Sequence, residues 1–310
     1  MKRETVLASL ALALAGCGGG SSITGEDEAP TFGDISFTIT DAPVDTVDEV
    51  WVQFTGVTLN PQGGAPIEVP FPSTVDIELL GLQGGTTATL VPPTTVPAGT
   101  YTWVRLAVNA EFDGVFDSYA VRDGGQIELR VPSGGSSGLQ VNGNLTVTQS
   151  QTTSFVLDWD LRQSLTDPAG QPGFILRPVI RVTSTTESGN LAGTVADSLL
   201  NDDLNGDATC ANDLNLDTGN AVYVYPGTVE SPDDMQNADV SPLVTGTVSF
   251  DGNDYRYSIA FLDPGEYTAA FTCQALNDDP ETDDDVEFAS VVTRVTIVNG
   301  ETTVQDFTAQ

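Results

Sequence analysis

Short runs of alternating apolar and polar residues recur along the chain, and glycine, proline, asparagine and aspartate separate them. The segment EVWVQFTGVTL (49–59) places its apolar side chains on one face of a predicted strand: Val50, Val52 and Phe54. The segment TSFVLDWDLRQS (153–164) does the same with Phe155, Leu157, Trp159 and Leu161, and points Val156, Asp158, Asp160 and Arg162 outward. Strands and turns at about 8–12-residue spacing, with no long amphipathic helix, predict an all-β sandwich fold.

The segment STTESGN (184–190) lacks this alternation and predicts a hinge between two tandem β-sandwich domains. We expect the first domain over residues 31–184 and the second over 187–310, each of a size that suits one sandwich. Their charges differ. Residues 31–184 hold 16 acidic residues and six arginines, a net charge of −10, whereas residues 185–310 hold 24 acidic residues and two arginines, a net charge of −22.

The N-terminal residues are typical of an exported lipoprotein. Lys2 and Arg3 precede an apolar run from Val6 to Ala15, which is shorter than the about 20 residues that a membrane span needs. We therefore expect residues 1–16 to be a signal peptide. The motif Leu14-Ala15-Gly16-Cys17 resembles the lipobox of bacterial lipoproteins, which implies a lipid anchor on Cys17 and a flexible tether over residues 17–30. The alternative is an ordinary signal peptide with an incidental cysteine.

Composition limits the chemistry that the chain can perform. The formal net charge is −34, and the sequence contains no histidine and one lysine, Lys2. Imidazole-dependent catalysis and histidine metal sites are therefore excluded, and nucleic acid and anionic membrane surfaces would be repelled. The only membrane contact that we expect is the lipid anchor. Since Gly18 is not the aspartate that retains enteric-type lipoproteins at the inner membrane, we expect an outer-membrane lipoprotein that faces the periplasm or the cell surface.

Two further cysteines, Cys210 and Cys273, lie in the second predicted domain. An exported protein meets an oxidising environment, so we expect these two cysteines to form a disulfide.

Two acidic segments flank these cysteines: NDDLNGDATCANDLNLDTGN (201–220) and LNDDPETDDDVEF (276–288). Alternating oxygen-bearing side chains that end in glycine are typical of loops that wrap calcium. No cofactor is expected to be required, but Ca²⁺ is a candidate ligand of Asp203, Asn205, Asp207, Asp213, Asn215, Asp217, Asp279 and Asp283. The EF-hand form is excluded because residue 212 is asparagine where a bidentate glutamate is needed. The alternative interpretation is a pair of solvated acidic loops.

Tryptophan and arginine side chains are the other candidate binding groups. Trp51, Trp103 and Trp159 could stack on sugar rings, but each lies within a predicted strand, where a core position is more usual. Arg177 and Arg181 lie four residues apart in ILRPVIRV (175–182). They could form an anion-binding groove, or they could pair across strands with aspartates such as Asp158.

Five phrases, in this order, resemble one family: TITDAPVDTVDEVWVQFTGVTL, PAGTYTWVRL, VPSGGSSGLQV, FVLDWDLRQS and ILRPVIRV. The family is the bacterial lipoprotein module known as domain of unknown function 4382, and the resemblance covers about residues 33–183. The rest of the chain, with AVYVYPG, SPDD and FLDPGEYTAAFTC, resembles an acidic Ig-like or transthyretin-like sandwich that often follows this module. The resemblance implies an exported, lipid-anchored β protein.

These observations favour a non-enzymatic protein with a structural, adhesion or binding role in the periplasm or at the cell surface. Its candidate ligand is an unidentified glycan or protein. An accessory carbohydrate-binding lipoprotein is the alternative. A glycoside-active enzyme with a carboxylate pair is a third, weaker candidate.

Overall fold

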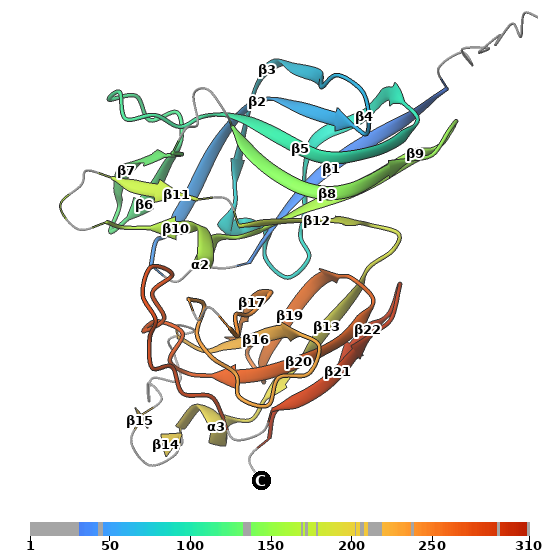
Figure 1. Ribbon diagram of the computed structural model, residues 1–310. Coiled ribbons are helices and arrows are strands. Elements are labelled where there is room, and N and C mark those ends of the chain that lie inside the picture. The colour runs from blue at the N-terminus through green and yellow to red at the C-terminus, as the bar shows by residue number, and fades with distance from the viewer. Residues whose placement is uncertain are drawn as a thin grey trace, which may run out of the picture. The chain divides into compact units, whose positions relative to one another are not determined.

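Two sheets enclose the core of the first half of the chain (Figure 1). The computed structural model describes residues 31–42, 46–132, 138–168, 170, 173–177, 179–201, 203–204, 208–209, 219–236, 239–289 and 292–308. The smaller sheet has the order β12–β9–β1–β4, with β1 (Phe32–Ala42), β4 (Ala88–Pro97), β9 (Thr152–Asp160) and β12 (Ile180–Ser184). Its strands β1 and β9 run parallel, whereas its other neighbouring strands pair antiparallel.

The larger sheet has the order β10–β11–β7–β6–β2–β5–β8, and β3 also pairs with β2. Its strands are β2 (Glu49–Pro61), β3 (Ile67–Glu78), β5 (Gly99–Asn109), β6 (Tyr119–Arg122), β7 (Gly125–Arg130), β8 (Leu139–Val147), β10 (Leu165–Thr166) and β11 (Phe174–Leu176). The short helices η1 (Leu80–Leu82) and α2 (Leu161–Ser164) follow β3 and β9.

The predicted alternation of β2 and β9 is confirmed, and it builds this core. Val50, Val52 and Phe54 are buried, whereas the side chains between them are partly exposed. Phe54 of β2 meets Trp159 of β9 edge to face across the sandwich, with ring centroids 6.3 Å apart.

The outward-pointing side chains of β9 and α2 are not exposed, in contrast to the sequence expectation. Val156, Asp158, Asp160 and Arg162 point away from the core, but each is at least 94% buried. Segments of β17 and β19, from the second half of the chain, line the same small cavity as Asp158. The outer face of the smaller sheet is thus covered by protein around β9 and α2.

A second pair of sheets encloses its own core between residues 189 and 307. The first has the order β18–β19–β13–β22, with β13 (Gly189–Val195), β18 (Ser249–Phe250), β19 (Tyr255–Leu262) and β22 (Thr302–Val304). The second has the order β17–β16–β20–β21, with β16 (Ala221–Pro226), β17 (Val244–Thr247), β20 (Gly265–Thr272) and β21 (Thr293–Ile297). A helix, α3 (Asp197–Asn201), and a ribbon of β14 (Asp203–Leu204) and β15 (Ala208–Thr209) follow β13.

Residues Thr31–Gln310 form one compact unit. Among the described residues, each sheet draws its strands from only one half of the chain, so the all-β, two-sandwich architecture is as the alternation predicted. The link between the halves is short, because β12 ends at Ser184 and β13 begins at Gly189. Every helix in the described part of the chain is too short or too polar to cross a membrane.

Strand β16 is buried on both of its faces, which positions the site described next. Val222 and Val224 point into the second core, while Tyr223 and Tyr225 point the other way and pack with Phe288. Two chain segments, 227–236 and 274–289, supply the side chains that cover this outer face.

Candidate functional site

Two tyrosines on the outer face of β16 anchor the segments that build the candidate metal centre. The hydroxyl of Tyr223 donates a hydrogen bond of 2.6 Å to Oδ2 of Asp278. The hydroxyl of Tyr225 donates one of 2.5 Å to the carbonyl of Asp233. The alternation of AVYVYP places both phenols on the same face of the strand. Because each phenol bonds a different segment, the strand holds the two segments next to each other.

Carboxylates from these two segments converge over the tyrosines. Asp234, Asp278 and Asp284 each offer an oxygen that lies within 4.8 Å of the others, and Asp233, Asp234 and Asp283 form a second such group. Asp234 is fully buried and Asp278 is 6% exposed, whereas Asp284 is half-buried. We call these five residues the acidic cluster.

Main-chain amides stabilise part of this negative charge. The N–H of Met235 donates to Oδ1 of Asp278 at 3.3 Å, and the N–H of Gln236 donates to Oδ1 of Asp234 at 3.1 Å. The N–H of Asp284 donates to the other oxygen of Asp234. Such amide donors orient a carboxylate while leaving it further lone pairs.

The charge that remains is electrostatically unfavourable. Burial, helped by the neighbouring charge of Asp234, raises the pKa of Asp278 to about 6, against the lowering effects of the Tyr223 hydroxyl, the Met235 amide and Arg162. A bound cation would favour the ionised form instead. All the donors are oxygens, a set that suits Ca²⁺ or Mg²⁺ rather than zinc.

The structure distributes the predicted calcium ligands differently from the sequence expectation. Asp283 belongs to the acidic cluster, but Asp279 does not; it is exposed, and its Oδ1 accepts a bond from the Glu281 amide. Asp203 begins β14, and its side chain is not described. The remaining predicted ligands lie outside the described residues: Asn205, Asp207, Asp213, Asn215 and Asp217.

The sequence analysis missed three members of the acidic cluster: Asp233, Asp234 and Asp284. Asp233 and Asp234 lie in SPDD, a turn-like phrase just after the buried strand AVYVYP. Their spacing matches no known metal-binding loop motif. They can be recognised as candidate ligands only because the fold places them beside the segment that follows β20. Asp284 is one of three consecutive aspartates, so the sequence could not single it out.

Cysteine positions test the anchor and disulfide predictions only in part. Cys273 directly follows β20, is 7% exposed and is disulfide-bonded. Cys17 and Cys210 lie outside the described residues. The lipid anchor and the Cys210–Cys273 pairing therefore stay predictions.

The three tryptophans do not gather at one site. Trp159 is fully buried in the first core, which is the alternative that its strand position favoured. Trp51 and Trp103 lie half-buried on the outer face of the larger sheet. Trp51 stacks on Tyr119, with centroids 6.3 Å apart, while Trp103 pairs with Asn60, nine residues further along β2. At about 3.3 Å per residue, this separates the two indoles by roughly 30 Å.

The arginines are paired with acids. Arg181 of β12 forms an ion pair with Asp158 of β9, its direct neighbour in the strand register. Arg177 pairs with Glu281 at 2.8 Å. Arg181 is mostly buried and Arg177 is exposed, so the pair does not line one open anion groove. The alternative interpretation, in which an arginine pairs with an aspartate on the neighbouring strand, is correct for Arg181.

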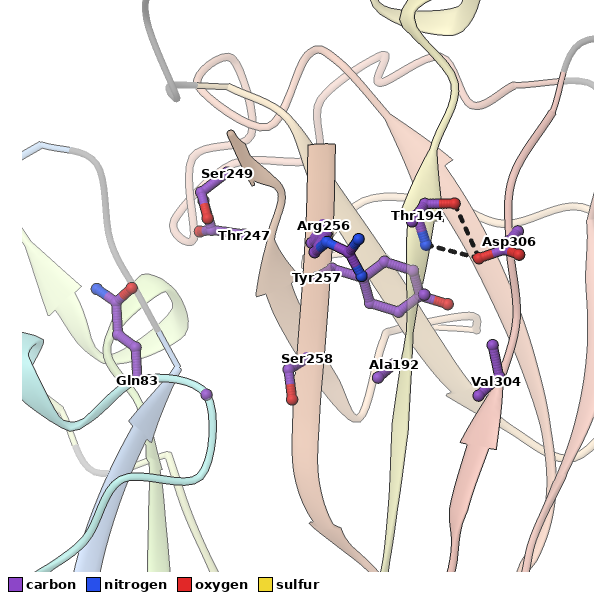
Figure 2. A pocket seen from close by; sticks show the side chains of 12 residues that line it. Gln83, Ala192, Thr194, Thr247, Ser249, Arg256, Tyr257, Ser258, Val304 and Asp306 are labelled. Atoms are coloured by element: carbon purple, nitrogen blue, oxygen red, sulfur yellow. Dashed lines mark hydrogen bonds between the residues drawn. The ribbon is translucent and has the colours of Figure 1, made fainter. Parts of the chain in front are cut away.

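A separate groove of about 640 Å³ lies over β13, β19 and the chain around β22 (Figure 2). Thr194 donates from its main-chain N–H and its hydroxyl to Oδ1 of Asp306, at 2.8 and 2.9 Å. Arg256 is held by Asp251 and Asp254 at 2.5 and 2.7 Å. The charged side chains at this groove are thus already paired, and its remaining polar groups are mainly hydroxyls.

Comparison with known proteins gives a family match over the first sandwich. Residues 32–178 match the model of the family described as "Domain of unknown function (DUF4382)". No curated protein matches the chain.

Three solved structures show weak similarity to this chain. A leucine-rich repeat protein from Bacteroides thetaiotaomicron has 11% identity and a TM-score of 0.20, over 90% of this chain and 27% of that one. A minor pilin from Streptococcus agalactiae has 11% identity and a TM-score of 0.21, over 88% of this chain and 94% of that one.

A fimbrial protein from Bacteroides ovatus has 7% identity and a TM-score of 0.23, over 90% of this chain and 49% of that one. This chain thus spans about a quarter of the first of these structures and about half of the third. Similarity at these TM-scores carries no argument about function.

Proposed function

We propose that this chain, whose residues 32–178 match the model of the DUF4382 family, is an exported, lipid-anchored β-sandwich protein with a structural, adhesion or binding role, and that calcium stabilises its second sandwich. The acidic cluster carries the calcium part of the proposal. Asp234 and Asp278 are both buried, they approach each other from different segments, and burial already raises the pKa of Asp278 to about 6.

A cation would relieve this repulsion and tie the two segments together. Since Ca²⁺ takes six to eight oxygen ligands, carboxylates from both segments, with water, would complete its coordination. Binding to the folded state alone stabilises it in proportion to the logarithm of the free ion concentration. An exported protein that meets calcium outside the cell would then have a more stable second sandwich there.

Thermal unfolding tests this proposal. The midpoint should be higher in millimolar calcium than in EDTA, and also higher than in sodium chloride of matched ionic strength. D278N should lose the calcium response, because asparagine keeps the shape and the hydrogen-bond acceptor but removes the charge. D285N is the matched control, since Asp285 is exposed, lies in the same loop and belongs to neither carboxylate group. Equal midpoints in calcium and in matched sodium chloride would show that the salt only screens charge and that the acidic cluster binds no calcium.

Membrane anchoring is tested separately. Cys17→Ser should move the protein from the membrane fraction to the soluble exported fraction, and mass spectrometry of the wild type should detect a lipid on Cys17. A lipid-free wild type would refute the anchor. Two reactive thiols in the unreduced exported protein would refute the Cys210–Cys273 disulfide.

The outer face of the larger sheet supports a second candidate function, glycan binding. Trp51 is accompanied there by Tyr119 and by Phe116, which is 46% exposed. Aromatic rings beside polar side chains are suited to stacking on sugar rings. Glycan-array binding that Trp51→Ala abolishes, and that Trp103→Ala preserves, would favour a short-sugar site at this end of the face; no binding by the wild type would exclude it.

A further inference from the structure

A small cavity of about 20 Å³ lies between the smaller sheet of the first sandwich and strands β17 and β19. It is separate from the acidic cluster and shares no residue with it. Asp41 and Asp158 line it, and both are about 95% buried. A space of this size holds one water-sized particle.

Three buried polar atoms at this cavity have no hydrogen-bond partner among the described residues: both carboxylate oxygens of Asp41 and the hydroxyl of Thr245. Neither carboxylate oxygen of Asp41 accepts a hydrogen bond from any described residue, and the hydroxyl of Thr245, which is 2% exposed, also has no described partner. The main-chain amide of Leu161 is near enough to lower the pKa of Asp41, but it does not meet the geometry of a hydrogen bond. Buried polar groups in native proteins are almost always paired, so an ionisable side chain with two orphaned oxygens points to a missing ligand.

The surrounding charges identify the kind of ligand. Besides burial, the side chains that raise the pKa of Asp41 are Asp160, Asp158 and Glu78, all of them carboxylates. Arg181 is committed to Asp158. Water could supply hydrogen bonds here, but it could not balance buried negative charge, whereas a cation would coordinate the unpaired oxygens and balance that charge.

We propose that this cavity holds one calcium ion, bound by the carboxylates of Asp41 and Asp158 and by the hydroxyl oxygen of Thr245. Thr40 and Ser258 also line the cavity, and its lining contains no nitrogen- or sulfur-bearing side chain, which suits the all-oxygen coordination that calcium takes. Asp41 and Asp158 belong to the first sandwich and Thr245 to the second. The ion therefore joins the two sandwiches, and we expect its release to be slow because Asp41, Asp158 and Thr245 are all at least 94% buried.

Calcium release into a chelator tests this. Wild-type protein is loaded with calcium, freed of external calcium by gel filtration, and mixed with an excess of a chromophoric chelator. We expect a slow phase equal to one ion per chain from the cavity. D41N and, as a variant that leaves every carboxylate in place, T245V should both lose this phase. D48N, which alters an exposed aspartate in the same sandwich, should retain it.

The test also separates this site from the acidic cluster. In D278N the slow phase should persist, whether or not the cluster binds calcium, because Asp278 does not line the cavity. The proposal is overturned if the wild type releases no slow ion, or if the slow phase survives in both D41N and T245V.

Discussion

Tyr223 donates a 2.6 Å hydrogen bond to Asp278, and both side chains are buried on the outer face of β16. The bond joins a strand of the second sandwich to the loop that follows β20, and it aims the carboxylate toward Asp234. A rigid strand residue thus positions a loop residue that would otherwise be repelled by its neighbours.

Tyr223→Phe should therefore weaken both the fold and the acidic cluster. The change leaves a buried carboxylate oxygen without its strongest donor, which costs about 1–3 kcal/mol in the free energy of unfolding. Urea denaturation at pH 8 measures this loss. At pH 5 the loss should be smaller, because Asp278 is then mostly protonated. Tyr119→Phe is a control, since the ring of Tyr119 stacks on Trp51 and not near the cluster. An unchanged unfolding free energy for Tyr223→Phe would show that the bond contributes nothing.

Stability without calcium should fall as the pH rises from about 4 to about 6. Burial raises the pKa of Asp278 and of Asp160 from 3.8 to about 6. A carboxyl group whose pKa is higher in the folded state favours folding below its unfolded pKa, and this contribution is lost as the pH rises through the folded value. In EDTA, D278N should remove the part of this fall that Asp278 causes and leave the part that Asp160 causes. Millimolar calcium should also reduce the fall, because calcium binds the ionised form.

A pH profile in EDTA that rises steadily over this range, with D278N and wild type superimposed, would contradict the assigned burial of Asp278. The control is D285N, which should follow the wild-type profile since its carboxylate is exposed.

Trp159 and Trp51 should behave in opposite ways on truncation. Trp159 is fully buried and packs against Phe54, so Trp159→Ala should cost about 3–5 kcal/mol in unfolding free energy. Trp51 stacks at a half-exposed position on Tyr119, and Trp51→Ala should cost about 1 kcal/mol. Denaturant midpoints with equal slopes compare the two. Equal losses would mean that the face assignments of β2 or β9 are incorrect.

Replacing only one partner of the buried ion pair between Arg181 and Asp158 should lower the free energy of unfolding more than replacing both partners. Their side chains are 17% and 7% exposed. R181M leaves Asp158 buried beside Asp41 and Asp160, and it should cost about 3–5 kcal/mol. The double variant D158N/R181M removes both charges and should recover most of that loss. Unfolding in EDTA measures the difference; a double variant as unstable as R181M would show that the arginine acts through packing alone.

The alternation of apolar and polar residues determined which face of each main strand enters a core. In β2, Val50, Val52 and Phe54 had to lie together because successive side chains of a strand point to opposite sides. Turn spacing determined the all-β class, and composition excluded imidazole chemistry. The two halves of the chain were also visible, since strand alternation stops over residues 184–190.

Tertiary structure decided what covers the other faces and which loops meet. Alternation assigns Asp158 and Asp160 to an outer face. It cannot show that β17 and β19 lie against Asp158, or that both carboxylate oxygens of Asp41 have no partner in the described part of the chain. Likewise, Asp234 and Asp278 are 44 residues apart in the sequence. They meet only because β16 and β20 are neighbours in one sheet, and Tyr223 and Tyr225 fix the segment after each strand against the same face. Strand order is set by long-range packing, which no local pattern records.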